Sequence, residues 1–124
     1  MTFALCPNHI PSHCPSPHDT HPPLARPSDV CNDITTNTTA YFPSNDSHVV
    51  LPEAPHPRYR HAAAAVGDKI FVYGGCDVTD ALVTAVDVFD VPTRSWSTLP
   101  NAFSQATSDN AGFVLGTKIY SVGG

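Results

Sequence analysis

The fold is decided by residues 57–100, which read PRYRHAAAAVGDKIFVYGGCDVTDALVTAVDVFDVPTRSWSTLP. Part of this stretch returns later in the chain at a constant distance. The double glycine Gly74-Gly75 recurs 49 positions later as Gly123-Gly124. The same offset relates Gly67 to Gly116, Lys69 to Lys118 and Ile70 to Ile119. A repeat of about 50 residues is typical of architectures that stack like units against one another.

Four short apolar runs lie within this stretch, and each is closed by turn-forming residues. They cover residues 61–66, 69–74, 83–89 and 95–98. Runs of this length, rich in Val, Ile and aromatic residues, predict strands of an antiparallel sheet. The alanines of the first run favour a helix. However, six residues fenced by Pro57 and Gly67 are too few to form one alone, so we predict a strand there as well.

Apolar side chains occur on both faces of these strands. In the second run Ile70 and Val72 point to one face, and Phe71 and Tyr73 point to the other. The sheet is therefore expected to be covered on both sides.

The glycines at the end of the second strand predict a close contact, because glycine in a strand marks the approach of another group. We expect the rings of Trp96 or Phe89 to cover Gly74 and Gly75.

Five features of this stretch occur together, namely Arg60-His61, Gly74-Gly75, Phe89-Asp90, Trp96 and Leu99-Pro100. In this combination residues 58–100 resemble a kelch repeat, which forms the blades of one class of β-propeller. The resemblance implies an all-β fold made of four-stranded antiparallel blades. It also implies a structural repeat motif of Gly74, Gly75, Phe89, Asp90 and Trp96, continued by Gly123 and Gly124.

The chain divides into four parts on this basis. Residues 1–33 are rich in Pro and His and are predicted to be a disordered tail. Residues 34–57 are interpreted as a degenerate half-blade with strands at 34–42 and 48–52, aligned by Leu51-Pro52 on Leu99-Pro100. Residues 58–100 are the complete repeat, and residues 101–124 are the first half of the next, with strands at 111–115 and 118–123.

One complete and two partial blades cannot close a propeller, which needs about 4–8 blades. We therefore expect either a fragment of a longer chain that supplies further blades or self-association of copies. The break in the middle of a repeat favours the fragment.

The loops at one end of the blade are the candidate binding surface. The loop before the first strand and the loop after the second leave the same edge of an antiparallel sheet. Kelch proteins dock partners on such a face, which by resemblance would be lined here by Arg58, Arg60, His61, Asp77, Asp80 and Asp109. The alternative is that Arg60 and His61 only hydrogen-bond neighbouring blades.

Charge and hydropathy exclude several classes of function. The net charge of −5, without any run of Lys or Arg, argues against nucleic acid and anionic membranes. Neither a membrane span nor a signal peptide is visible, which predicts a cytoplasmic protein. Two glycosylation sequons, at Asn37 and Asn45, and four cysteines point instead to an extracellular adhesion module.

Candidate chemistry is sparse. Cys6, His9, His13, Cys14, His18 and His21 are possible metal ligands. Prolines interrupt their span and a Cys-x₂-Cys pair is missing, so we predict neither a metal site nor a cofactor. The catalytic motifs of hydrolases, zinc proteases and nucleotide-binding enzymes are absent from the sequence.

The leading interpretation is a scaffold for protein–protein contacts. The alternative is part of a kelch-like propeller enzyme, of the oxidase or sugar-epimerase type.

Overall fold

The computed structural model describes residues 34–100, 102 and 105–124 as an all-β fold. The predicted tail, residues 1–33, lies outside these described residues. The strands are β1 (Thr38–Phe42), β2 (Ser47–Leu51), β3 (Ala62–Val66), β4 (Lys69–Tyr73), β5 (Val86–Asp90), β6 (Ser95–Leu99), β7 (Ala111–Leu115) and β8 (Lys118–Val122). All neighbouring strands pair antiparallel.

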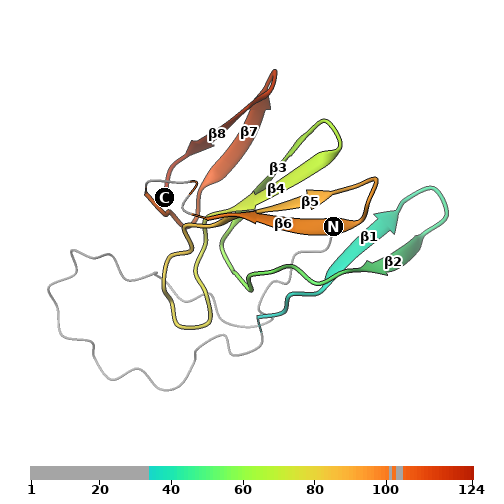
Figure 1. Cartoon of the computed structure of the whole chain (residues 1–124), viewed down its shortest axis with the longest axis horizontal. Coiled ribbons are helices and arrows are strands. Elements are labelled where there is room, and N and C mark those ends of the chain that lie inside the picture. The colour runs from blue at the N-terminus through green and yellow to red at the C-terminus, as the bar shows by residue number, and fades with distance from the viewer. Residues whose placement is uncertain (1–33, 101, 103–104) are drawn as a thin grey trace, which may run out of the picture.

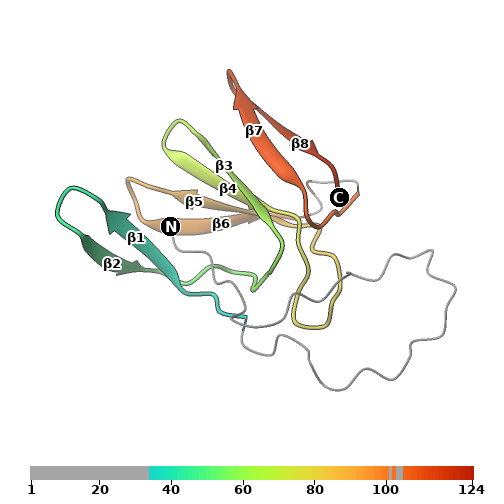
Figure 2. The same ribbon diagram turned by 180° about the vertical axis from the view of Figure 1, so that it is seen from behind.

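The strands form one four-stranded sheet and two hairpins. The sheet has the order β3-β4-β5-β6 and is called the blade below. The pair β1-β2 is the N-terminal hairpin and the pair β7-β8 is the C-terminal hairpin. Figures 1 and 2 show the two hairpins on opposite sides of the blade, with the three sheets splayed apart from one another. The prediction of one complete four-stranded blade and two partial ones is confirmed.

The predicted strands agree with the observed ones to within one residue, except at two starts. The strand predicted from residue 34 is wrong at its start, because β1 begins only at Thr38. The alanine run is strand β3, as expected, and not a helix. The third strand of the blade was predicted to start at residue 83, which is wrong, because β5 starts at Val86. Val83 instead donates its N–H to the carbonyl of Gly75 at 3.0 Å, and Leu82 pairs with Cys76. Residues 82–85 therefore belong to the loop between β4 and β5, whose backbone turns back on the end of β4.

One face of the blade packs against the C-terminal hairpin. Alternate residues of β3, β4 and β5 meet on this face, and the buried ones are Ala62, Ala64, Tyr73, Val86 and Val88. Val114 and Ile119 of the hairpin pack against them. We call this the front face of the blade.

The back face of the blade is turned toward the N-terminal hairpin. Phe89 is buried there and its ring lies 5.0 Å from that of Trp96, centroid to centroid. Trp96 Nε1 donates to the carbonyl of Pro52 at 2.8 Å and so ties β6 to the segment after β2. A cavity of about 340 Å³, lined by residues of the hairpin together with Ile70 and Phe89, separates the two elements. The prediction that both faces are covered is confirmed for the front face and only in part for the back face, where Val72 and Phe89 are buried but Ala65 is exposed.

The repeat is visible in the backbone as well as in the sequence. Left-handed backbone angles, which only glycine adopts freely, return at the offset of the repeat. At 49 positions the pairs are Arg60 and Asp109 (φ 57° and 55°), Gly67 and Gly116 (56° and 61°), Gly74 and Gly123 (68° and 86°), and Gly75 and Gly124 (82° and 105°). At 48 positions Asp46 and Arg94 share φ 52°. The two hairpins therefore repeat the turn geometry of the blade, and not only its composition.

The expected covering of the double glycine by Trp96 or Phe89 is wrong. A Cβ on Gly74 would lie 2.6 Å from the carbonyl oxygen of Thr107, and one on Gly75 would overlap the carbonyl of Tyr59. Trp96 is paired with Phe89 and lies three residues before the end of β6 that is next to the double glycine. The glycines admit the backbones of two neighbouring loops, because those loops bond to the end of β4.

Candidate functional site

Three loops meet at one end of the blade, which we call the loop end. They are residues 58–61 before β3, residues 74–85 between β4 and β5, and residues 105–110 before β7. Backbone hydrogen bonds join them: Tyr59 and Cys76 exchange two bonds of 3.0 Å, and Gly75 N–H donates to Thr107 at 2.8 Å. Loops tied in this way form a firm platform, which is the usual setting for binding residues on a rigid scaffold.

Arg60 and Asp109 come together at this end, as the sequence predicted for residues of one face. Arg60 Nε donates to Asp109 Oδ1 at 2.7 Å, and the Asp109 N–H donates to the Arg60 carbonyl at 3.0 Å. The two residues occupy the same position in successive repeats, so this contact links one blade to the next. Arg60 therefore makes a contact between neighbouring repeats of the kind that the sequence left open as an alternative, and 53% of the Asp109 side chain is exposed.

The loop between β4 and β5 is organised by Asp77 and Asp80. Asp77 Oδ1 accepts hydrogen bonds from the Thr79 hydroxyl (2.7 Å), the Thr79 N–H (2.7 Å) and the Ala81 N–H (3.1 Å). The hydroxyl of Thr79, more than any other group, lowers the pKa of Asp77. Asp80 accepts a hydrogen bond from the Tyr59 hydroxyl. Both carboxylates thus shape the loop, and its tip exposes Val78 and Thr79.

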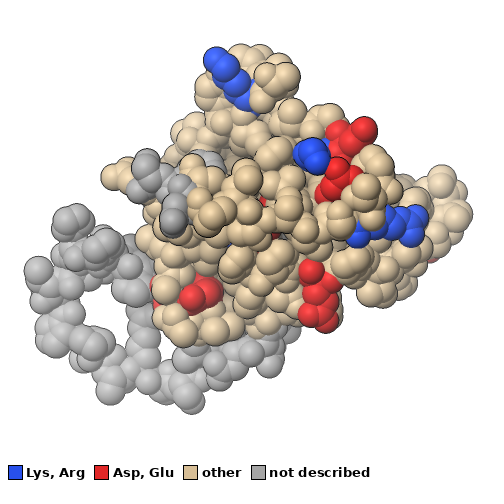
Figure 3. Space-filling model, in the orientation of Figure 1, with Lys and Arg blue, Asp and Glu red and all other residues tan. Residues whose placement is uncertain are grey.

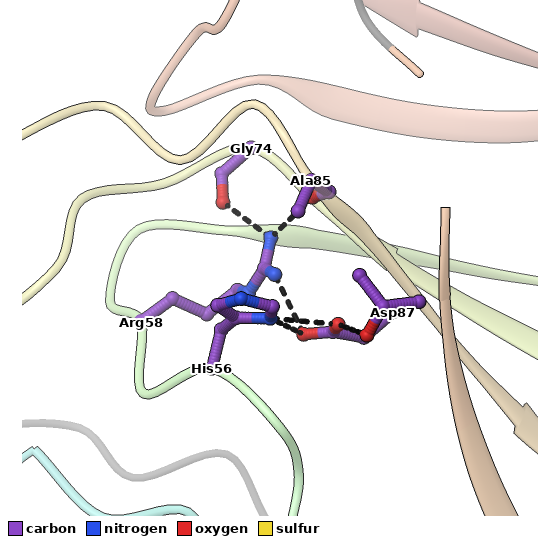
Figure 4. Close-up of polar contacts among 6 residues, drawn as sticks. His56, Arg58, Gly74, Ala85 and Asp87 are labelled. Atoms are coloured by element: carbon purple, nitrogen blue, oxygen red, sulfur yellow. Dashed lines mark hydrogen bonds and ion pairs between the residues drawn. The ribbon is translucent and has the colours of Figure 1, made fainter. Parts of the chain in front are cut away.

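Arg58 does not belong to the exposed face, and that prediction is wrong. Its side chain is only 3% exposed, and its Nη2 lies 2.7 Å from Asp87 Oδ2. Its Nη1 donates to the carbonyls of Gly74 (3.1 Å) and Ala85 (3.2 Å). Figure 4 shows the guanidinium turned into the blade between these partners. These contacts join the end of β4 to the start of β5. They also supply the partners that the buried Arg58 cation requires.

Asp87 is the centre of this buried cluster. It is the second residue of β5, and 1% of its side chain is exposed. His56 Nδ1 lies 2.9 Å and 3.1 Å from its two oxygens, and the Thr98 hydroxyl donates to it at 2.9 Å. Burial lowers the pKa of Arg58, and the charge of Asp87 opposes this shift. The cluster therefore fixes the segment before β3, strand β5 and strand β6 to one another.

His61 stands close to this cluster. Burial is the first cause that lowers the pKa of His61, and the positive charge of Arg58 is the second. Both effects favour the neutral imidazole. In the next repeat Asn110 replaces His61, and its buried side chain donates to the Ser121 hydroxyl at 2.8 Å. A polar side chain thus stands at the junction between loop and strand in both repeats.

A small cavity opens beside His56. Its volume is about 370 Å³, and it is lined by His56, Pro57, Asp77, Val78 and residues 82–85. The imidazole is held by a buried carboxylate on one side and is 41% exposed. Such a hollow is of the size that small ligands use.

The remaining predicted residues lie elsewhere. Asp90, at the end of β5, bonds Lys69 and Thr93 and belongs to the opposite end of the blade, which we call the turn end. Asn37 and Asn45 are exposed, and Asn45 lies in the turn of the N-terminal hairpin, where its Oδ1 accepts from the Ser47 hydroxyl at 2.7 Å. The cysteine and histidine cluster at residues 6–21 lies outside the described residues. Among the residues that are described, no three His, Cys, Asp or Glu are grouped as a metal site would need.

Sequence reasoning missed Asp87, His56 and Thr98. The signal for Asp87 was present, since an aspartate between Val86 and Val88 is unusual in a buried strand. His56 and Thr98 gave no such signal, because only the folded chain brings residues 31 and 11 positions away beside Asp87.

Comparison with known proteins agrees with this architecture. Residues 57–102 match the family described as Kelch motif. An F-box/kelch-repeat protein of Arabidopsis thaliana is 38% identical over 64 residues, which are 52% of this chain and 16% of that protein. Kelch domain-containing protein 3 of Bos taurus is 32% identical over 75 residues, 59% of this chain and 20% of that protein.

A third relative is an enzyme by its name. The N-(sulfonatooxy)prop-2-enimidothioate sulfolyase of Thlaspi arvense is 33% identical over 76 residues, which are 58% of this chain and 22% of the enzyme. The chain thus spans about a fifth of the length of these relatives. The four-stranded sheet coincides with the matched motif, and the chain is a kelch-repeat protein.

Proposed function

We propose that this chain is a scaffold for a protein partner, which binds at the loop end of the blade. The observation that carries the proposal is the three-loop platform, which is held by backbone hydrogen bonds and still exposes side chains at its surface. Kelch repeats generally mediate protein interactions, which supports the same class of function.

The charge of the loop end favours a basic partner. Three aspartates, Asp77, Asp80 and Asp109, stand there beside Arg60, whose guanidinium is already paired with Asp109. Figure 3 shows acidic side chains over the loop between β4 and β5. The accessible groups are Val78, Thr79 and the Asp109 carboxylate. A partner segment with Lys or Arg beside an apolar residue would complement this surface.

The test is affinity capture followed by a binding isotherm with the recovered protein. The variant Val78→Ser with Asp109→Asn alters the loop end, and Asn tolerates the left-handed backbone of residue 109. We expect this variant to weaken binding about tenfold or more, a loss of about 1.4 kcal/mol. Added salt should weaken binding of the unmodified chain as well.

Arg94→Ser is the matched control, because Arg94 is exposed in a turn at the opposite end. It should bind like the unmodified chain. Equal loss of the partner in both variants would contradict a site at the loop end.

A second candidate is a small-molecule site in the cavity beside His56. The observation that favours it is the buried carboxylate of Asp87 behind His56 Nδ1, because a histidine oriented in this way can act as a general base. The test is incubation with N-(sulfonatooxy)prop-2-enimidothioate, the compound in the name of the Thlaspi arvense relative. Turnover that is lost in His56→Gln would support this candidate, and the absence of turnover in the unmodified chain would contradict it.

A further inference from the structure

The two hairpins are complementary halves of one blade. The C-terminal hairpin repeats β3-β4 at an offset of 49, and the N-terminal hairpin repeats β5-β6 at an offset of 48. In the blade β4 pairs with β5. The corresponding strands of the hairpins are β8 and β1, and among the described residues β8 pairs only with β7 and β1 only with β2.

The hydrogen-bonding groups at these two edges have matching positions. Val91 N–H donates to the Asp68 carbonyl at 2.9 Å, so residues 68 and 91 are a hydrogen-bonded pair of the β4-β5 ladder. Such pairs alternate along an antiparallel ladder. Ile70 with Phe89 and Val72 with Asp87 are therefore the next bonded pairs.

The same alternation of hydrogen-bonding groups applies at the unpaired edges of β8 and β1. Ile119 and Ser121 occupy the positions of Ile70 and Val72, so their N–H and C=O groups point away from β7. Thr39 and Tyr41 occupy the positions of Asp87 and Phe89, and their backbone groups point away from β2.

The apolar surfaces of the hairpins are also open. Phe113 and Tyr120 stack with ring centroids 5.1 Å apart. They alternate with Val114 and Ile119, which pack against the blade, so they lie on the face of the C-terminal hairpin that is turned away from it. They are 52% and 38% exposed, and Val122 beside them is 59% exposed. In the blade the equivalent front face is buried under the next hairpin. The molecule thus shows which surface covers such a face, namely the back face of another β3-β4 unit.

Side-chain volumes support this choice of cover. Within the chain the bulky Tyr73 packs on Gly112, where a Cβ would overlap its hydroxyl. One repeat later Val122 replaces Tyr73, and one repeat earlier Ala63 replaces Gly112. In a contact of Val122 with Ala63 of another copy, the side chain on one side is smaller than Tyr73 and the one on the other side is larger than Gly112. The two residues together would therefore still fill the space between the faces.

From these observations we propose that β8 pairs with β1 of a second copy of this chain, so that two hairpins complete one four-stranded blade between copies. The register is that of β4 with β5: Ile119 pairs with Tyr41 of the second copy, and Ser121 pairs with its Thr39. In this arrangement Phe113 and Tyr120 lie over the back face of the second copy, at its Ala63 and Ala65.

The interface is of the head-to-tail type, and each copy keeps one open edge until a ring closes.

The experiment uses sedimentation velocity of the full chain and two edge variants. Ser121→Pro removes the outward N–H of β8, and Thr39→Pro removes that of β1; proline is tolerated where the N–H faces away from the paired strand. We expect the unmodified chain to sediment as assemblies that grow with concentration, and each variant to sediment as a monomer. Ser121→Ala is the matched control, since it loses the contact with Asn110 but keeps the N–H, and it should associate.

Mixing the two proline variants makes the test decisive. The β8 of Thr39→Pro and the β1 of Ser121→Pro are both intact, so the mixture should form a one-to-one dimer and nothing larger. If one variant fails to fold by circular dichroism, the other variant alone still tests its own edge. A monomeric unmodified chain at all concentrations, or association of the variants like the unmodified chain, would overturn the proposal. This outcome is independent of binding at the loop end.

Discussion

At the scale of single residues, Asp87 holds the blade together through charge. Its carboxylate receives Arg58, His56 and Thr98 from three different segments while it is itself buried. A buried ion pair adds little stability compared with an apolar pair of the same shape, but loss of one partner leaves the other charge without compensation.

We therefore predict that Asp87→Asn lowers the free energy of unfolding by about 3–5 kcal/mol. The shape of the side chain is kept, so the loss reports on the charge left on Arg58. Urea denaturation followed by tryptophan fluorescence measures it, since Trp96 lies on the neighbouring strand.

The control for this change is Asp109→Asn. Asp109 is paired with Arg60 but largely exposed, and such pairs contribute about 1 kcal/mol or less. Equal losses at both positions would show that burial of the Arg58 charge is not the cause.

Gly112 illustrates a different constraint at the same scale. Its backbone angle is ordinary, and the space for a side chain is taken by the Tyr73 hydroxyl. Gly112→Ala should separate the C-terminal hairpin from the front face and lower the free energy of unfolding by about 1–3 kcal/mol, as overpacking does.

The double variant with Tyr73→Phe tests the mechanism of this loss. It removes the overlapping oxygen, and the ring carbon behind it lies 3.0 Å from the added Cβ. Thermal melts should show a partial recovery. If Tyr73→Phe only adds to the loss, the contact with Gly112 is not what limits the space.

At the scale of elements, the turn between β5 and β6 is held by Asp90. Its carboxylate accepts from the Lys69 ammonium at 2.6 Å and from the Thr93 hydroxyl and N–H. These contacts, with Lys69 first, lower the pKa of Asp90 from 3.8 to about 2.

The sign of the pH dependence follows from this shift. Because the folded pKa lies below the ordinary value, the contribution of Asp90 is complete above pH 3.8 and is lost as the pH falls to about 2. Lys69→Met should raise the midpoint of the Asp90 carboxyl carbon in an NMR titration. Lys118→Met, at the same position one repeat later, should leave it unchanged, and a shift of similar size there would argue for a general charge effect.

The elements could be predicted from the sequence because their signals are local. Short apolar runs and the glycines at 67, 74 and 116 predict the strands and turns to within a few residues, and most strand ends agree. The start of β5 at Val86 could not be predicted, because Val83 is as apolar as a strand residue and only its bond to Gly75 assigns it to a loop.

The candidate site was predicted less well for the same reason. The topology of the sheet predicted that Arg60 and Asp109 lie at one end, and the two side chains are in contact there. The burial of Arg58 depends on Asp87, 29 positions away, and a loop position alone predicts exposure. Contacts between residues that are distant in the sequence decide which charged side chains face solvent and which are buried and stabilise the fold.

At the scale of the whole molecule, each front face is covered by the back face of the unit that follows. The blade satisfies this rule with the C-terminal hairpin, whose own outer face and β8 edge remain open among the described residues. An open antiparallel edge has a recognisable pattern of exchange, because every second amide points to solvent.

In the Thr39→Pro variant, which offers no usable β1 edge, we predict that the amides of Ile119 and Ser121 exchange with solvent much faster than that of Tyr120, which faces Phe113 in the hairpin. Addition of the Ser121→Pro variant, whose β1 is intact, should slow Ile119 and Ser121 and leave Tyr120 nearly unchanged. Residue-resolved hydrogen exchange by NMR measures all three amides in one sample. Slow exchange at Ile119 and Ser121 before the second variant is added would mean that another strand already pairs with β8. The edge of β8 would then be covered within a single copy and would not need a second one.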